Sequence, residues 1–508
     1  MDEVAHRTLR LRAFLRKFRA FPDEYYEYVN GLLPSEPDWA TLYSEEWEES
    51  GNETPRVELG TDEATKLLRK RVRAIRRKHG TRTVLLGGPP CQSYSVAGRA
   101  RNAGNPNYDI NEDERLSLYK EYAMVLGKLQ PWIAVMENVK GMLSAEYEGA
   151  RVFDDVMAAL QNAGGRNRYR LLALAPATGS HSWKDGLEPK DFLVRAEEHG
   201  VPQRRHRVFV ICIRTDVAAT LPEGMFPKLK PREEQVVLSD VVGEMPQLRS
   251  RLSRGDDGGA WQSAVEDAYG LVGKHLPELS RSQERKFRSA LKLARKSASG
   301  EPLPFRDLSV IGAAGVASSC PESLRDWFRD ENLKRLPNNE TRGHIREDIG
   351  RYLYAAAFAR TFGRSPRAED FPSELAPEHA NWKSGKFADR FRVQLADKPS
   401  TTITSHISKD GHYFIHPDPS QCRSLTVREV ARLQTFPDNY LFRGGRTQQY
   451  VQVGNAVPPY LAHQIAEQVV KVVWHRDRKL QRSVRQQQQM ANGTRRLRGR
   501  SGGKSNRR

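Results

Sequence analysis

Short apolar runs alternate with amphipathic segments over residues 61–214, and this alternation restricts the fold more than any other feature of the sequence. The runs read TVLL, WIAVM, YRLL and RVFVICI, and helical patterns precede three of them, near residues 62–79, 115–129 and 152–163. Thr61 is placed to cap the first helix and Gly80 to end it. Apolar strands alternating with helices predict an α/β fold with a doubly wound, Rossmann-like sheet.

The rest of the chain shows other patterns. Residues 1–60 look helical, and residues 215–386 mix short helices with loops rich in arginine and proline, so we expect a separate or inserted mixed domain there. Ordered patterns return over residues 387–474. Residues 475–508 are basic and of low complexity, which predicts a disordered tail.

The charge of the chain suggests a polyanionic partner. The formal net charge is +19 over 508 residues, and the tail after Trp474 supplies more than half of it. Nucleic acid is the simplest such partner, and a solvated basic surface without a specific role is the alternative. No apolar run is long enough to span a bilayer, so we expect no membrane contact and a cytoplasmic, nucleoid-associated protein.

The four cysteines do not form a metal or disulfide pattern. Cys91, Cys212, Cys320 and Cys422 lie far apart, without a CxxC pair or a Cys/His cluster, and we expect no metal site. Cys212 lies inside an apolar run and is expected to be buried. Cys91 alone follows a turn, in the stretch LGGPPCQSYS.

Three loops at strand ends bring together a thiol, a carboxyl group and guanidinium groups. They are GGPPCQ after TVLL, ENV after WIAVM, and PQRRHR ahead of VFVI. Each alone is more often a structural turn, an ion pair or a solvated loop. Methylation of cytosine at carbon 5 uses all three, because a thiolate must add to carbon 6 while an acid and a cation polarise the ring. The target base must also be flipped out of the duplex.

The sequence resembles the DNA (cytosine-5)-methyltransferase family in five motifs that follow the family's order. They are GGPPCQSYSVAGRAR, MENVKGM, GVPQRRHRVFVI, RVQLADKPSTTIT, and LTVREVARLQTFPDNY followed by QVGNAVPP. The resemblance implies a catalytic methyltransferase domain in two parts, 61–214 and 387–474, around a target recognition domain at 215–386. It implies double-stranded DNA as partner and S-adenosylmethionine as methyl donor.

The resemblance also assigns residues to roles. Cys91 occupies the nucleophile position, Glu137 that of the acid, and Arg205 and Arg207 would bind and orient the flipped cytosine. Gln92, Ser93, Ser95 and Asn138 would belong to the catalytic loop and its support.

One family motif is not found. A glycine-rich turn of the form FxGxGG, which would hold S-adenosylmethionine, does not precede Cys91, so the first strands of the sheet are expected to be missing. The remaining cofactor candidates are Pro89, Asn455, Ala456 and Val457. A reading frame that starts late, a second polypeptide that completes the sheet, or a decayed gene would each explain this. We predict that the chain alone binds S-adenosylmethionine poorly and methylates little.

Two alternatives remain open from the sequence. The chain could be a DNA-binding subunit without catalysis, or it could methylate tRNA, because an RNA-methylating branch shares these motifs. The large segment at 215–386 favours DNA, and the compact order of motifs favours a restriction-modification role.

Overall fold

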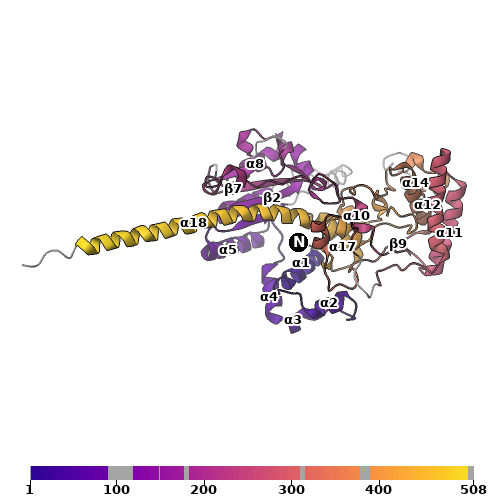
Figure 1. Ribbon diagram of the computed structural model, residues 1–508, viewed down its shortest axis with the longest axis horizontal. Coiled ribbons are helices and arrows are strands. Elements are labelled where there is room, and N and C mark those ends of the chain that lie inside the picture. The colour runs from indigo at the N-terminus through magenta and orange to yellow at the C-terminus, as the bar shows by residue number, and fades with distance from the viewer. Residues whose placement is uncertain are drawn as a thin grey trace, which may run out of the picture. The chain divides into compact units, whose positions relative to one another are not determined.

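The computed structural model forms two compact units (Figure 1). The sheet unit comprises Glu58–Val194, His206–Lys230 and His463–Arg508, and the helical unit comprises Met1–Val57, Arg195–Arg205 and Pro231–Ala462. The structure describes residues 2–89, 118–147, 149–166, 168–176, 182–308, 315–377, 382 and 389–501.

A five-stranded mixed sheet lies at the centre of the sheet unit. Its order is β1-β2-β7-β5, with β6 also paired to β7. β1 runs parallel to β2, whereas β7 is antiparallel to both β2 and β5. The strands span Val84–Gly87 (β1), Ile133–Val139 (β2), Tyr169–Leu172 (β5), Leu193–Arg195 (β6) and His206–Arg214 (β7). The α/β class is therefore confirmed, and the reversed direction of β7 is a feature that its apolar run alone does not predict.

Helices α7 (Leu118–Leu129) and α8 (Val152–Gln161) build a core on one face of the sheet. Side chains alternate along β2 and β7, so that Met136 and Val210 face this core while Phe209 lies on the other face. Cys212 belongs to the same core and is fully buried, as its apolar run predicts.

Helix α5 (Asp62–His79) begins and ends at the predicted residues. The Thr61 side chain accepts a hydrogen bond from the Ala64 N–H, and Gly80 ends the helix with a φ of 60°. Only Ala64 and Val72 of α5 are buried, so most of its predicted apolar face is incompletely covered.

Helix α18 spans Pro459–Ser501 and therefore extends into the segment predicted to be a disordered tail. The side chains of His475 and Lys479 hydrogen bond to the carbonyl of Thr220, just after α9 (Thr215–Ala218), and Asp477 forms an ion pair with Arg82. Half of residues 480–501 are glutamine or arginine, which favour helix.

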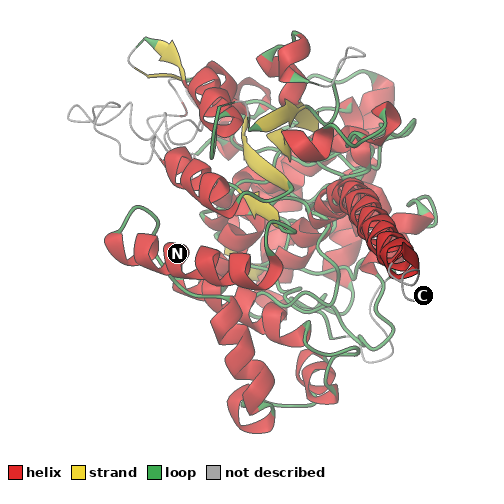
Figure 2. Cartoon of the chain, turned by 90° about the vertical axis from the view of Figure 1, so that its left-hand side faces the viewer, coloured by secondary structure: helices red, strands yellow, loops and turns green. Residues whose placement is uncertain are grey.

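Helices are the main regular structure of the helical unit, as Figure 2 shows for the chain generally. Helices α11 (Gly258–Lys274), α12 (Arg281–Ser299) and α14 (Arg346–Phe362) form a bundle with its own apolar core. A second core joins α10 (Leu238–Val242), α13 (Glu322–Phe328), α16 (Val427–Leu433) and α17 (Arg446–Asn455). The N-terminal helices are α1 (Glu3–Leu15), α2 (Asp23–Val29), α3 (Trp39–Leu42) and α4 (Ser44–Glu53). Short two-stranded pairs also occur: β3 (Glu146–Tyr147) with β4 (Ala150–Arg151) in the sheet unit, and β8 (Arg251–Leu252) with β9 (Gly343–His344) in the helical unit.

The two units divide the chain at different places from the predicted domains. Residues 387–462 group with the segment predicted to recognise the target and with the N-terminal helices, and the division falls at Lys230 instead of residue 214. Among the described residues, no helix combines the length and the apolar character that crossing a membrane needs.

Candidate active site

Glu137 and Arg207 form an ion pair where β2 ends and β7 begins. The antiparallel register sets Val139 opposite Arg207 and Glu137 opposite Phe209, which puts Glu137 and Arg207 diagonally on the same face. Arg207 Nε lies 3.2 Å from Glu137 Oε1, and the two side chains are 14% and 22% exposed. The pair is thus shielded from bulk water but not fully buried.

The turn after β1 approaches this ion pair closely. A Cβ atom at Gly88 would lie 2.9 Å from Glu137 Oε2, so a larger residue at this position would displace the carboxylate. Asn138 is buried, and its side-chain amide donates a hydrogen bond of 3.4 Å to the carbonyl of Pro89. Its carbonyl oxygen accepts from the Val139 N–H. The second glycine of GGPP and the asparagine of ENV thus join the two loops.

Cys91, Gln92, Ser93 and Ser95 lie outside the described residues. Pro89, two residues before Cys91, is buried in the sheet unit beside Asn138. The turn that leads to the thiol therefore starts within contact distance of Glu137, and the structure brings together the sequence-predicted Pro89, Glu137, Asn138 and Arg207.

Arg205 lies in the helical unit, although it is only two residues from Arg207. Its guanidinium is 2% exposed, and it donates hydrogen bonds to the carbonyls of Ile403 (2.8 Å) and Gly454 (3.1 Å). These contacts join three separate segments of the unit. They give Arg205 a positioning role that its place in the QRRxR motif does not reveal.

Gln203 makes similar links and was not among the predicted site residues. It is fully buried, its amide group donates to the carbonyl of Leu433, and its side-chain oxygen accepts from the Ile403 N–H. The backbone at Arg204 also pairs with Ser400. The QRR and KPSTTIT motifs are therefore neighbours in space. In the sequence, only the polar residues of the second motif hint at this contact.

Of the cofactor candidates, Asn455 is the last residue of α17, and Ala456 and Val457 follow it in the helical unit. Asn455 is exposed, and Ala456 and Val457 are half-buried. A Cβ atom at the preceding Gly454 would lie 2.5 Å from the backbone of Thr404 and Ser405, so only glycine allows this close packing. Glycine in QVGNAVPP therefore serves packing, and these three residues belong to the helical unit whereas Glu137 and Arg207 belong to the sheet unit.

The comparisons with known proteins agree with these motifs. A family model described as C-5 cytosine-specific DNA methylase matches residues 65–471. The type II methyltransferase M.Bpa9945I of Bacillus paralicheniformis is 32% identical over 390 residues, which cover 77% of this chain and 70% of that protein. M.AgeI of Thalassovita gelatinovora is 27% identical over 408 residues (76% and 82%), and M.DdeI of Desulfomicrobium norvegicum is 26% identical over 402 residues (76% and 72%). The chain therefore belongs to the C-5 cytosine-specific DNA methylase family, a family of DNA (cytosine-5-)-methyltransferases.

Proposed function

We propose that this chain methylates carbon 5 of a flipped cytosine in double-stranded DNA through a covalent adduct with Cys91. The observation that carries the proposal is the Glu137–Arg207 ion pair, which faces the turn leading to Cys91. A thiol, an acid and a cation at one strand edge are the groups that this reaction requires.

The proposed reaction proceeds in balanced steps. The Cys91 thiolate adds to carbon 6 of the base, and Glu137 in its protonated form donates to ring nitrogen 3, so that the electron pair of the C5–C6 bond becomes nucleophilic at carbon 5. Arg207 holds Glu137 in place and donates to the carbonyl oxygen of the base. S-adenosylmethionine, which the family resemblance implies, would supply the methyl group to carbon 5, with its S–CH3 bond breaking and S-adenosylhomocysteine leaving. A base then removes the proton from carbon 5, the C6–S bond breaks, the thiolate leaves, and the proton on ring nitrogen 3 returns to Glu137.

The other three cysteines are unsuited to act as the nucleophile. Cys212, Cys320 and Cys422 are buried free thiols. Burial raises the pKa of all three thiols, in Cys320 to about 11. A nucleophilic thiol needs the opposite shift. This supports Cys91 as the nucleophile.

The described residues make an incomplete site for S-adenosylmethionine. Pro89 lies in the sheet unit and Asn455–Val457 in the helical unit. Neither group supplies a glycine-rich turn or a carboxylate for ribose hydroxyls, and the described residues ahead of β1 are helical and charged. The missing groups must therefore come from outside these residues.

We propose that a segment carrying the glycine-rich turn, from outside the described residues, adds a strand to β1. Among the described residues β1 pairs only with β2, which leaves its outer edge open. Leu86 is 70% exposed and Val84 38%, although strands of parallel sheets are normally covered on both faces. An added strand and its helices would cover these side chains.

The relatives also guide the biological setting. The matched proteins named above are type II methyltransferases. We therefore propose a role in a restriction-modification system, with residues 215–386 reading the target sequence.

Trapping on DNA that contains 5-fluorocytosine tests the catalytic proposal. Fluorine at carbon 5 cannot leave as a proton does, so the enzyme stays bound to the base. We expect a covalent adduct on denaturing gels when S-adenosylmethionine and any completing polypeptide are present, and its complete loss in Cys91→Ser. Cys320→Ser is the matched control and should keep the adduct. An adduct that survives Cys91→Ser would refute the assignment, and no adduct under these conditions would support a DNA-binding subunit.

Calorimetry tests the proposal about the cofactor. Titration of S-adenosylmethionine into the purified chain should give no binding in the micromolar range, because the described residues form only part of a site. Tight binding by the chain alone would contradict the need for this additional segment.

A further inference from the structure

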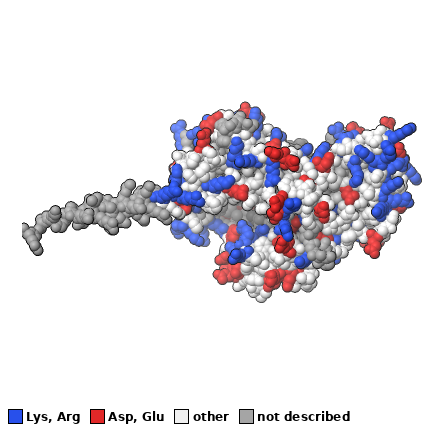
Figure 3. Space-filling model, viewed as in Figure 1, with Lys and Arg blue, Asp and Glu red and all other residues white. Residues whose placement is uncertain are grey.

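Almost all charged side chains of helix α12 (Arg281–Ser299) are positive. Its sequence, RSQERKFRSALKLARKSAS, holds seven lysines and arginines and a single carboxylate, Glu284. Figure 3 shows lysine and arginine side chains gathered over the bundle that α12 forms with α11 and α14. A surface helix that is merely solvated usually mixes both signs.

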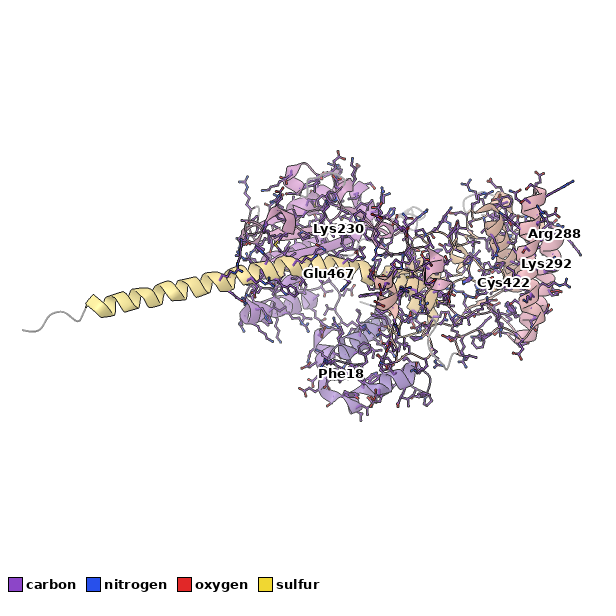
Figure 4. The ribbon with its side chains drawn as sticks, in the orientation of Figure 1. Phe18, Lys230, Arg288, Lys292, Cys422 and Glu467 are labelled. Carbon is purple, nitrogen blue, oxygen red and sulfur yellow. The ribbon has the colours of Figure 1, made fainter. Side chains whose placement is uncertain are left out.

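Five of these cations form one row along the helix, which we call the basic stripe: Arg281, Arg285, Arg288, Lys292 and Lys296. Their spacing of three or four residues places them on one face. All five are exposed, and Figure 4 shows Arg288 and Lys292 on the outer side of the bundle. The stripe extends over about 22 Å at the helical rise of ~1.5 Å per residue.

The opposite face of α12 packs into the bundle core and anchors the stripe. Phe287, Ala290, Leu291 and Ala294 are buried in the bundle core. Ser280 accepts a hydrogen bond from the Gln283 N–H, and the Gln283 side chain accepts from the Ser280 N–H, which fixes the start of the helix. The cations therefore project from a fixed scaffold.

Most of the stripe has no carboxylate opposite it. Arg288 pairs with Glu284 at 2.8 Å. For Arg281, Arg285, Lys292 and Lys296, the described part of the chain provides no carboxylate at ion-pair distance. Other arginines of the bundle face carboxylates, as Arg346 does Asp267 at 2.9 Å.

This arrangement opposes the stability of the isolated helix. Like charges three or four residues apart repel one another, and along the stripe every neighbouring pair has the same sign. A polyanion along the stripe would remove this repulsion. Duplex DNA is suited to this because it presents one negative charge per ~1.7 Å of its axis, so that several phosphates fall within the length of the stripe.

We propose that the basic stripe of α12 binds the phosphate backbone of duplex DNA and thereby positions the chain on DNA without reading its sequence. The inference rests on the proposed function in taking DNA as the partner. It assigns α12 to backbone contacts, which leaves base reading to other residues of the segment 215–386.

Salt-dependent binding tests the proposal. The stripe variant carries Arg281→Gln, Arg285→Gln, Lys292→Gln and Lys296→Gln, and fluorescence anisotropy measures its binding to two labelled duplexes of unrelated sequence over a series of salt concentrations. We expect affinity to fall about 10-fold to 100-fold on both duplexes. The plot of log affinity against log salt should become shallower by about 0.9 for each phosphate that the variant no longer neutralises.

A matched control removes the same charge from arginines of the helical unit that already face carboxylates: Arg329→Gln, Arg346→Gln, Arg364→Gln and Arg367→Gln. We expect this control to change affinity less than about 3-fold and to keep the salt slope. An equal loss in the control would overturn the proposal, because net charge alone would then explain the effect. An unchanged salt slope in the stripe variant would overturn it as well.

The trapping assay separates this inference from the proposed function. Stripe-dependent binding by a wild-type chain that gives no 5-fluorocytosine adduct would refute the catalytic function and keep the stripe. An adduct together with an unchanged salt slope in the stripe variant would support the catalytic function and refute the stripe proposal. No binding to duplex DNA at any salt concentration would refute both proposals. Circular dichroism melting of the stripe variant should show an unchanged or higher Tm, which excludes misfolding as the cause.

Discussion

Helix α12 and the segment around α16 belong to the same unit and are both rich in arginine, yet they use it in opposite ways. Arg423, Arg428 and Arg432 are fully buried. Arg423 pairs with both carboxylate oxygens of Glu429, Arg432 does the same with Asp438, and Arg428 donates to three backbone carbonyls. On α12 the cations face solvent. A guanidinium is therefore structural or available for binding according to the partners that surround it.

Removal of one buried partner should have the largest effect on stability. Asp438→Ala leaves the Arg432 guanidinium buried without its counter-charge, although the carbonyls of Val241 and Gly315 remain as acceptors. We expect the free energy of unfolding to fall by about 3–5 kcal/mol in a denaturant titration. Asp326→Ala on the exposed side of α13 is the control, and it should stay within about 0.5 kcal/mol of wild type. If Asp438→Ala lowers the free energy of unfolding by less than about 1 kcal/mol, the arginines around α16 do not differ from those of α12 in their dependence on a partner.

Acid should weaken the buried cluster. Burial lowers the pKa of His416 to about 4, so the folded protein keeps this ring neutral at a pH where the unfolded chain protonates it. Its contribution to stability is therefore complete above about pH 6.5 and is lost as the pH falls towards 4. The interval between the two pKa values corresponds to about 3 kcal/mol.

His416→Asn tests this pH dependence, because an asparagine oxygen can accept the Asp418 N–H bond that His416 Nδ1 accepts. We expect the free energy of unfolding of the variant to depend less on pH between 6.5 and 4. Glu429 will still make stability depend on pH below that range. Burial raises the pKa of Glu429, but the Arg423 guanidinium outweighs burial and lowers the pKa to about 2. An unchanged pH profile in the variant would show that His416 does not carry this effect.

A single charge reversal on α12 should have the smallest effect on stability, and of the opposite sign. In Lys292→Glu the new carboxylate lies one turn from both Arg288 and Lys296, so two repulsive pairs become attractive. We expect stability to rise by about 0.5 kcal/mol while affinity for duplex DNA falls. Thermal melting and anisotropy measure the two effects. A decrease in stability would mean that Lys292 already has a structural role, as the buried arginines do.

Much of the local structure could be predicted from the sequence. The strands β1, β2, β5 and β7 coincide with the apolar runs to within a few residues, and Thr61 caps α5 as its residue type and position indicate. Glu137 and Asn138 could be assigned to a strand end because polar residues there interrupt an apolar run. These features depend on neighbours within a few residues, which the sequence displays directly.

Other parts of the site depend on contacts between distant residues. Gln203 with Ile403, Arg205 with Gly454, and Gly454 with Thr404 are each separated by about 50 to 250 residues. The helical continuation of α18 beyond Trp474 does not follow from low complexity, which favours disorder, but from the helix propensity of glutamine and arginine.

The sequence by itself determined the α/β class, the family motifs and the excess of positive charge. The tertiary structure alone decided the direction of β7 and the placement of Arg205 in one unit and Arg207 in the other. It also decided which arginines lie buried against carboxylates and which form an open stripe. The physical reason is that periodicity and residue type act locally, whereas burial and the choice of partner are set by residues that the fold brings together from far along the chain.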